Sequence, residues 1–178
     1  MRNLAKFSLG SQRSWRTILK LSLWFFVGTY FVKSNLTPNF LRKAILLFFG
    51  ANLGSGVVLR RGVKVHFPWN LEISDGCWIG EDVWFINHEK IRIGSNVCIS
   101  QRSIICSGGH DYRSASLEYA HKPIEIKDGA WICLDAKILP GVTIGECSVV
   151  SAGEVARKSI PDYSMLVGGE IRPIDAPK

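Results

Sequence analysis

The chain has 178 residues, which fits one domain with a modest appendage, and 47% of them are hydrophobic, enough for a solid core. Its net charge of +7 is divided unevenly. Residues 1–71 hold eleven Lys or Arg and no Asp or Glu, whereas the rest of the chain holds 11 basic and 15 acidic residues. This asymmetry indicates a negatively charged partner for the N-terminal part. We do not expect that partner to be nucleic acid, since the sequence has no recognised binding motif.

The cysteines exclude a disulfide scaffold. There are five, at positions 77, 98, 106, 133 and 147. The odd number and the wide spacing fit neither a disulfide framework nor a metal cluster. The sequence therefore predicts reduced thiols, a cytoplasmic setting and no bound metal.

The first 50 residues form a basic segment rich in aromatic residues. Residues 1–14 are polar, and we expect them to be frayed. Residues 15–32 contain six aromatics, but their apolar run, 21–32, has twelve residues, and a membrane-spanning helix needs about twenty. A basic start before an apolar middle resembles a signal peptide. No small-residue cleavage site follows, so we do not expect export.

A second helix is predicted from Phe40 to Phe49, with Thr37 as its N-cap, Pro38 in its first turn and Gly50 as its stop. Two interpretations of residues 1–50 stay open. The helices cap the open end of the domain that follows, or their basic, Trp-rich surface also rests on the inner face of an anionic cytoplasmic membrane. The two roles are compatible.

Residues 73–161 repeat with a period of six. They divide into twelve units that each begin with an apolar residue, interrupted by two residues at Ile91-Arg92 and by an excursion at 111–125. Such self-similarity is typical of a parallel β-helix, in which three units make one triangular coil and the first residue of each unit points inward. The sequence therefore predicts a mainly β domain over 51–161. Its first part, up to residue 72, leads into the coil, and a tail follows at 162–178.

Several segments resemble the hexapeptide-repeat acyltransferases, among them the capsule and colanic acid biosynthesis acetyltransferases. They are GVVLRRGVKVHFPWNLEI (56–73), IGSNVCIS (93–100), GHDYRS (109–114), KPIEIKDGAWI (122–132) and ILPGVTIG (138–145). The resemblance implies a left-handed coil and a homotrimer with active sites between neighbouring subunits. It also implies acyl transfer from acetyl-CoA to a hydroxyl.

The resemblance also indicates a catalytic base. A hydroxyl needs a base within hydrogen-bond reach to take its proton as it attacks a thioester, and histidine suits this role because its ordinary pKa is about 6.5. His110, in a Gly-His-Asp-Tyr segment where the excursion begins, matches the family's catalytic histidine. His66, His88 and His121 match no catalytic position, and we expect them to be structural or exposed to solvent.

Two acidic residues are candidates for the acceptor site. Asp82 falls where more distant acetyltransferases have a polar acceptor-binding residue, with a plain turn aspartate as the alternative. Asp111 is a candidate to orient His110. We expect the excursion 111–125 to select the acceptor, since loops of this length without their own secondary structure are usually functional.

The resemblance assigns acetyl-CoA contacts to several residues. Trp131 matches a tryptophan that lines the pantetheine channel, with a subunit contact as the alternative. Ser151 and Ala152 resemble the segment whose backbone binds the pantetheine arm. Arg157 and Lys158 resemble the basic pair that meets the nucleotide phosphates, with a solvated charge pair as the alternative, and Lys158 is the stronger candidate. Arg172 stands roughly where the family has a basic residue in its tail, although the Asn-Pro that precedes that residue in the family is missing here.

These residues together predict an acetyl-CoA-dependent O-acetyltransferase. It would act on a sugar hydroxyl in exopolysaccharide or capsule assembly, by direct transfer without an acyl-enzyme. The basic head suits a sugar carried on a lipid diphosphate. The alternatives are an N-acyltransferase acting on an amino sugar and a non-catalytic β-helix scaffold. A zinc enzyme of the β-helix carbonic anhydrase kind is disfavoured, because the sequence has no His-x4-His pair.

Overall fold

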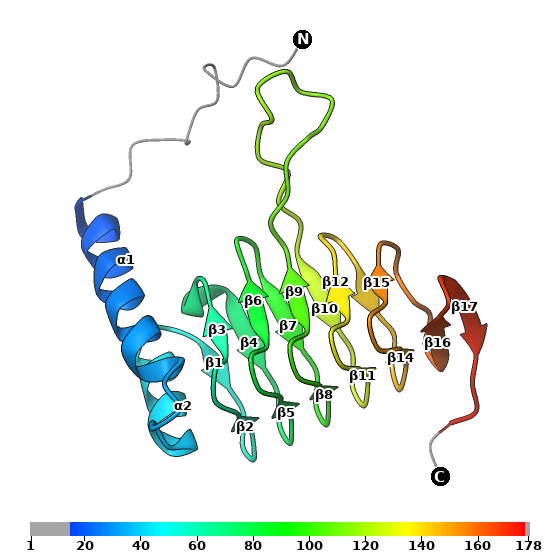
Figure 1. Ribbon diagram of the computed structural model, residues 1–178, viewed down its shortest axis with the longest axis horizontal. Coiled ribbons are helices and arrows are strands. Elements are labelled where there is room, and N and C mark those ends of the chain that lie inside the picture. Colours follow the sequence, from blue (N-terminus) through cyan, green and yellow to red (C-terminus); the bar gives the residue numbers. More distant parts are fainter. Residues whose placement is uncertain (1–14, 177–178) are drawn as a thin grey trace.

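The computed structural model describes residues 15–176 as a three-sided parallel β-helix, with helices at its N-terminal end and one long arm on its side (Figure 1). The expectation that residues 1–14 are frayed lies outside the described residues. Each full coil contributes one strand to each of three sheets, A, B and C. Sheet A contains β1 (Asn52–Leu53), β4 (Leu71–Ile73), β7 (Ile91–Ile93), β10 (Ile124–Ile126) and β13 (Thr143–Ile144).

Sheets B and C are the other two faces. Sheet B contains β2 (Val58–Leu59), β5 (Trp78–Ile79), β8 (Cys98–Ile99), β11 (Trp131–Ile132), β14 (Val149–Val150), β16 (Ser164–Val167) and β17 (Glu170–Pro173). Sheet C contains β3 (Lys64–Val65), β6 (Trp84–Ile86), β9 (Ile104–Cys106), β12 (Lys137–Ile138) and β15 (Val155–Ala156).

The first residue of every six-residue unit points into the prism. All twelve of these side chains, from Ile73 to Ala156, are buried, with exposed fractions of 3% or less. Parallel pairing places like on like from coil to coil, as where Ile132 pairs with Ile99. Full burial of an Ile side chain stabilises the fold by about 1.5–3 kcal/mol. These residues form one column on each of the three faces and supply a large part of the core, and the predicted period and fold class are confirmed.

The fourth residue of the unit makes the corner between two faces. In nine of the twelve units it has a φ between 52° and 81°, the left-handed region that Gly, Asn and Asp tolerate best. At Gly76 a Cβ would also press on the side chain of Asn96 in the next coil, which would have to shift. Asp82 is one of these corner residues.

The coil begins earlier than the sequence suggested. Leu53 pairs with Ile73 just as Ile73 pairs with Ile93, so residues 51–72, predicted as a lead-in, form a complete coil. These early coils take 20 residues each, whereas the pairing of Ile126 with Ile144 shows a later coil of 18. Ile91 and Arg92, predicted to interrupt the repeat, are ordinary strand residues of β7.

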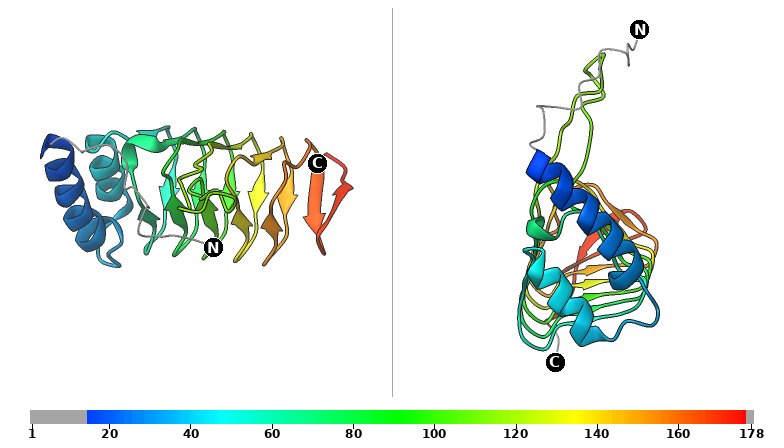
Figure 2. Two further views of the ribbon diagram at one scale, coloured as in Figure 1. Left: turned by 90° about the horizontal axis from the view of Figure 1, so that it is seen from above. Right: turned by 90° about the vertical axis from the view of Figure 1, so that its left-hand side faces the viewer.

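Helices close the N-terminal end of the prism (Figure 2). They are α1 (Trp15–Val27), its π-helical continuation η2 (Gly28–Val32) and α2 (Asn39–Phe48). The Asn39 side chain takes the place of a missing strand beside β2. Its Oδ1 accepts a hydrogen bond from the Leu59 N–H at 2.8 Å, and its Nδ2 donates to the Val57 carbonyl at 3.3 Å. These contacts confirm the predicted capping role. A cap is needed because an uncovered edge is free to pair with another chain.

Two buried side chains fasten these helices to the first coil. The Trp24 Nε1 donates to the carbonyls of Val65 and His66. The Arg42 guanidinium is 5% exposed and donates to three backbone carbonyls, those of Val32 (3.1 Å), Ser34 (2.6 Å) and Leu59 (3.3 Å). Burial lowers the pKa of Arg42, and the charge of Arg60 adds to that lowering.

The start of α2 differs from the prediction by one position. Asn39 is its first residue and Pro38 its N-cap, so Thr37 lies outside the helix, where it is buried. The predicted stop is confirmed, since Gly50 has a φ of 96°. Within residues 15–176, neither helix combines the length and apolar content that crossing a bilayer requires.

The C-terminal segment continues the solenoid rather than leaving it. β16 pairs in parallel with β14 and so extends sheet B by one strand. β17 then folds back antiparallel on β16, with Arg172 opposite Met165. The predicted tail, 162–178, is thus largely a hairpin that covers the last coil.

We expect Arg42→Met to lower the free energy of unfolding by about 2–4 kcal/mol, because three buried carbonyls lose a charged donor. Urea unfolding followed by circular dichroism measures this change. Lys43→Met removes the same charge one position along α2, from a half-buried side chain with one long contact to Gly54, and should change stability by less than about 0.5 kcal/mol. Equal losses in the two variants would contradict the assigned role of Arg42.

Candidate active site

The excursion is a two-stranded arm rather than a structureless loop (Figure 1). The Asp111 N–H donates to the Glu118 carbonyl at 2.8 Å, and the Ala120 N–H donates to the Gly109 carbonyl at 2.9 Å. The coil resumes at Ile124, where β10 begins, so the excursion ends at residue 123 and not at 125. Because the two strands of the stem are hydrogen-bonded, the stem fixes the positions of the side chains at its base.

His110 lies at the base of this arm, exposed to solvent, on the edge where sheet C passes into sheet A, the C–A edge. Its Nδ1 is 2.6 Å from the Leu117 carbonyl oxygen. A carbonyl can only accept, so Nδ1 carries the proton and Nε2 is the unprotonated nitrogen of the neutral ring. Leu117 has a φ of 53°, an uncommon conformation for a residue other than glycine. The arm is thus built to fix the tautomer of His110.

Asp111 is bound by Arg113, two residues further along the arm. Its carboxylate accepts a hydrogen bond from the backbone N–H of Arg113 at 2.9 Å and lies 3.4 Å from the Arg113 guanidinium. The backbone N–H of Arg113, followed by its side chain, lowers the pKa of Asp111. The Leu117 carbonyl contacts the His110 ring directly, and the orienting role suggested for Asp111 stays a prediction.

All four histidines of the chain lie in one row, which sequence reasoning missed. The ring centroids of His66 and His88 are 4.7 Å apart, those of His88 and His121 4.6 Å, and those of His121 and Tyr119 4.7 Å. Tyr119 continues the row to His110, at 5.1 Å. One signal was present in the sequence. His66 and His88 each follow a strand of sheet C by one or two residues, so coil stacking brings them to the same edge.

His121 connects the row to the arm. Its Nδ1 accepts a hydrogen bond from the Gly109 N–H at 3.1 Å, directly before His110. This bond requires an unprotonated Nδ1. Burial lowers the pKa of His121, Glu89 opposes that lowering, and the nearby His110 adds to it. His121 is therefore a structural support of the candidate base and not a solvated surface residue.

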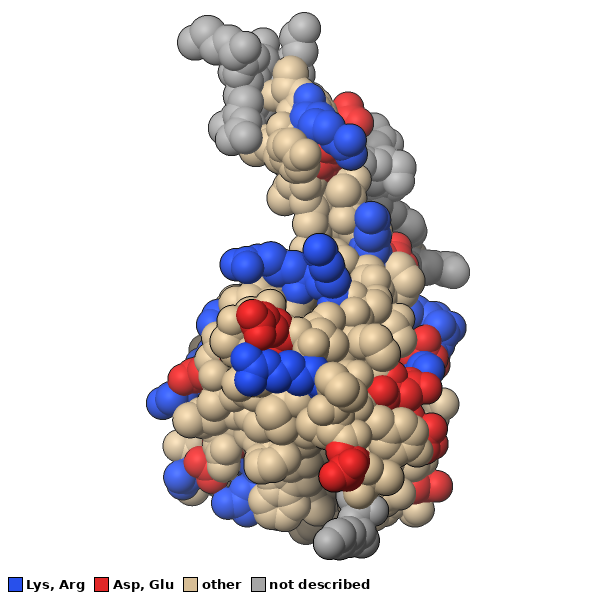
Figure 3. All heavy atoms as spheres, turned by 90° about the vertical axis from the view of Figure 1, so that its right-hand side faces the viewer, with Lys and Arg blue, Asp and Glu red and all other residues tan. Residues whose placement is uncertain are grey.

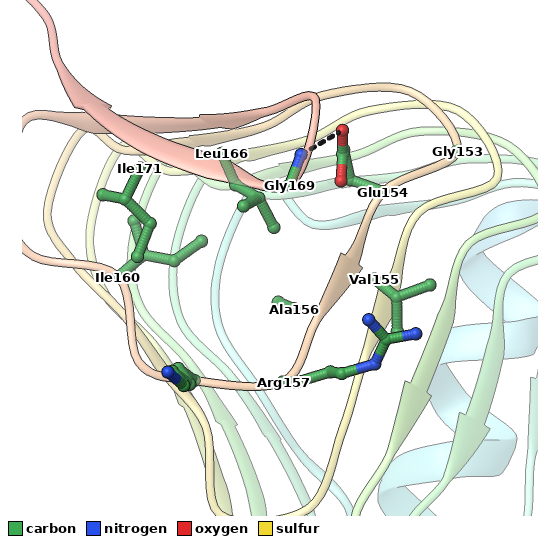
Figure 4. Close-up of a pocket in the computed structure, with 10 residues that line it drawn as sticks. Gly153, Glu154, Val155, Ala156, Arg157, Ile160, Leu166, Gly169 and Ile171 are labelled. Carbon is green, nitrogen blue, oxygen red and sulfur yellow. Dashed lines mark hydrogen bonds between the residues drawn. The ribbon is translucent and has the colours of Figure 1, made fainter.

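Two cations lie further along the edge that carries His110. Arg157 and Lys158 follow β15, and β9, which leads to His110, is two strands away in sheet C. Two strand spacings amount to about 10 Å. Both side chains are exposed and line a hollow of about 410 Å³ at the C-terminal end. Ile160, Leu166 and Ile171 form its apolar wall (Figure 4). Cations beside an apolar hollow fit a nucleotide that carries phosphates.

The pantetheine candidates lie on the outer surface of sheet B. Trp131 is 49% exposed, and its Nε1 donates to the Ser100 hydroxyl at 2.9 Å. β14 pairs with β11 and ends directly before Ser151, so Ser151 and the exposed Ala152 lie just past the end of the adjacent strand, where sheet B passes into sheet C. They form an open, neutral surface. Arg172 lies on β17, in the row of sheet B that runs from Trp131 through Val149 and Met165, and it forms an ion pair with Glu170 at 2.8 Å.

Asp82 is exposed at the corner that precedes β6, where sheet B passes into sheet C. His110 follows the carboxyl end of β9, two residues past the next corner. The two residues therefore lie at opposite edges of sheet C. Within a single chain, the structure groups His110 with Lys158 and keeps both away from Asp82 and Trp131.

Other chemistries find little support in the described residues. Across residues 15–176, no group of three or more His, Cys, Asp or Glu side chains is placed to hold a metal ion. All five cysteines are free thiols. Burial raises the pKa of Cys77, Cys98 and Cys133, which makes these thiols poor nucleophiles.

Comparison with known proteins finds relatives along almost the whole chain. WcaF of Escherichia coli K12, assigned as a colanic acid biosynthesis acetyltransferase, is 36% identical over 162 residues, which cover 90% of this chain and 89% of WcaF. A protein of Schizosaccharomyces pombe assigned as an acetyltransferase is 36% identical over 117 residues, 64% of this chain and 53% of its own length. No protein-family model matches the chain.

Solved structures agree with these relatives. The hexapeptide-repeat acetyltransferase VCA0836 of Vibrio cholerae, in complex with acetyl coenzyme A, superposes with a TM-score of 0.81 at 25% identity, covering 97% of this chain and 96% of that one. A galactoside acetyltransferase in complex with coenzyme A shares the fold, with a TM-score of 0.74 at 22% identity over 97% of this chain and 88% of that one.

We expect His121 to make stability depend on pH. Its folded pKa lies below the unfolded value of about 6.5, so its contribution is fully present above that pH and is lost as the pH falls through the folded pKa. The melting temperature of the wild type should therefore drop between about pH 7.5 and about pH 5.5, and His121→Gln should reduce that drop. An unchanged pH dependence in His121→Gln would contradict the assignment.

Proposed function

The chain belongs to the hexapeptide-repeat acetyltransferase family, and we propose that this member transfers the acetyl group of acetyl-CoA to a hydroxyl of a sugar. Acetyltransferase activity follows from the family. The sugar hydroxyl, the base and the direct route are the proposal. The observation that carries them is His110, an exposed histidine whose Nδ1 proton is held by the Leu117 carbonyl at the base of the arm.

His110 Nε2 takes the proton of the sugar hydroxyl as the oxygen attacks the thioester carbonyl carbon of acetyl-CoA. The carbon–oxygen bond forms, a tetrahedral oxyanion results, and the carbon–sulfur bond then breaks. The imidazolium returns the proton to the departing sulfur, so CoA leaves as a thiol. The Leu117 carbonyl supports this cycle because it accepts from Nδ1–H in both charge states of the ring. No acyl-enzyme is required.

Acetyl-CoA would bind with its phosphates at Arg157 and Lys158 and its pantetheine arm against Trp131, Ser151 and Ala152. Exposed cations beside a hollow of about 410 Å³ support the first contact, and a half-exposed indole on a flat sheet supports the second. Arg172 is a weaker candidate, since its ion pair with Glu170 must open before it contacts a phosphate.

A complete site requires more than one copy of the chain. His110 lies on the C–A edge, and in a three-sided prism this edge is opposite the face of sheet B that carries Trp131. Copies packed side by side would bring the C–A edge of one against the sheet B face or the Asp82 corner of the next. Closure after three copies gives three equivalent sites, so we propose a homotrimer.

The acceptor we propose is a sugar of an exopolysaccharide or capsule, free or carried on a lipid diphosphate. The assignment of WcaF to colanic acid biosynthesis supports this choice. Asp82 would accept hydrogen bonds from acceptor hydroxyls, and Asp111, directly after His110 in the arm, would contact the rest of the sugar. An amino sugar acylated on nitrogen is the alternative that the same site allows.

His110→Ala should reduce the kcat of acetyl-CoA-dependent transfer by on the order of a hundredfold or more, as loss of a general base predicts. Release of CoA thiol measures this rate, with nucleotide-linked and lipid-linked sugars and their amino counterparts as acceptors. His66→Ala, at the far end of the row, should keep most of the activity. Equal rates in wild type and His110→Ala would show that His110 is not the base, and failure of both to bind acetyl-CoA would favour a scaffold role.

Sharing of the site predicts complementation. Asp82→Ala and His110→Ala, each weakly active alone, should recover activity when the two chains are co-expressed, because some interfaces then combine an intact Asp82 with an intact His110. The activity of the co-assembled mixture should exceed that of the two pure variants mixed after assembly. If co-assembly brings no gain, the two residues do not serve one site across an interface.

A further inference from the structure

The N-terminal helices present a large apolar surface that nothing in the described structure covers. The α1–η2 rod buries Trp24 and Val32 against the first coil. A helix that packs on one side only is expected to be polar on the other. In α1 and η2 the side opposite Trp24 is apolar as well, and its residues are spaced so that they lie on one side of the helix. The exposed side chains of this apolar stripe are Trp15 (68%), Leu19 (61%), Phe26 (57%) and Tyr30 (64%).

The surface continues onto α2 and the connection before it. Leu36 is 93% exposed, Phe40 73% and Phe48 83%. Both helices lie across the same end of the prism, with their outer sides turned away from the coils (Figure 2). We refer to the exposed apolar residues of α1, η2, α2 and this connection as the helical face. Large exposed apolar patches mark sites of interaction with a protein or a membrane.

The charge of this end distinguishes between these partners. No Asp or Glu precedes Glu72 in the sequence, and eleven Lys or Arg do. The C-terminal end of the prism, in contrast, shows acidic and basic side chains next to one another (Figure 3). A second copy docked through the same face would bring the exposed Lys20 and Lys33 against their equivalents, and the helices themselves contain no carboxylate to offset these charges. An anionic membrane supplies both the apolar layer and the negative charge.

A groove beside the helical face is likewise lined by both apolar and basic side chains. It has a volume of about 420 Å³ and separates α1 from strands β3 and β6. Phe25, Trp24 and Trp84 line it, and so do Lys33 and Lys64. Aromatic rings with two ammonium groups suit a phosphate that is attached to an apolar chain.

We propose that the helical face binds the surface of a membrane that contains anionic lipids. α1 and α2 lie in the headgroup layer, the apolar stripe contacts the acyl chains, and Lys33 and Lys64 meet lipid phosphates. The solenoid axis then points away from the bilayer. This inference does not depend on the catalytic assignment, since His110 lies on the arm and outside the helical face.

The test is flotation of the full-length protein with vesicles of phosphatidylcholine and phosphatidylglycerol, roughly three to one, against vesicles of phosphatidylcholine alone. The wild type should partition into the anionic vesicles at least about tenfold more strongly, and about 0.5 M salt should reduce the difference. Absence of binding to the anionic vesicles, or equal binding to both kinds, overturns the proposal.

Matched variants assign the binding to residues. Phe26→Ser with Phe48→Ser should weaken binding at least about tenfold, whereas Tyr112→Ser with Ile171→Ser, on the arm and the C-terminal hairpin, should not. Lys33→Gln with Lys64→Gln should weaken it more than Lys127→Gln with Lys137→Gln. Circular dichroism establishes that each variant is folded. Equal binding by the helical-face variants and their controls overturns the proposal.

A second readout is independent of these substitutions. Brominated lipids quench nearby tryptophans, so they should quench Trp15 in the wild type, and Trp15→Phe should lose most of the quenching, whereas Trp131→Phe should keep it. If Phe26→Ser with Phe48→Ser changes the sedimentation of the protein instead of its vesicle binding, the helical face joins copies of the chain and the membrane proposal is wrong.

Discussion

The stacking of one inward apolar side chain per strand holds this molecule together. Each of these residues is buried by its equivalents in the coils before and after it, and parallel hydrogen bonds keep the columns in register. The left-handed corner at the fourth position makes this stacking possible, because it turns the chain after two or three strand residues. Every outward position is then released from packing. The outward positions therefore carry the cations, the indoles and the histidines, and the chemistry of the protein lies on a surface whose geometry the core has fixed.

Six-residue periodicity was sufficient to predict the fold, because a buried column constrains the sequence at every unit. The periodicity was less informative in the first and last coils, where the sequence does not follow a strict period of six. The first coil escaped notice because residues 51–72 alternate without a strict period of six, although Leu53 pairs with Ile73 in the same register as later coils. The C-terminal strand β16 escaped for a related reason. It lies two residues earlier than a coil of 18 would place it, since Val149 pairs with Met165.

The candidate site was predictable in its residue types and only partly in its arrangement. A Gly-His-Asp-Tyr segment identifies His110 by resemblance, but no local pattern shows that the Leu117 carbonyl, seven residues away, contacts its ring. That contact depends on how the arm folds back on itself. The same holds for His121, which is eleven residues from His110 in sequence. Its hydrogen bond to Gly109 forms only because the two strands of the stem pair. Sequence neighbours are poor guides to contacts in a hairpin, because its pairs are set by the turn.

The solenoid also fixes distances along its axis. Its coils are stacked at the spacing of hydrogen-bonded strands, about 4.8 Å, so positions along its axis come in fixed steps. β9, which leads to the arm, is the third strand of sheet C counted from the helices, two steps or about 10 Å beyond the first coil. On a bilayer that binds the helical face, the arm stands at a height set by a whole number of coils. An insertion or deletion of one complete coil before β9 would raise or lower it by one step while leaving every local contact of the arm intact. Evolution of such a protein can therefore adjust the reach of its catalytic edge without redesigning it.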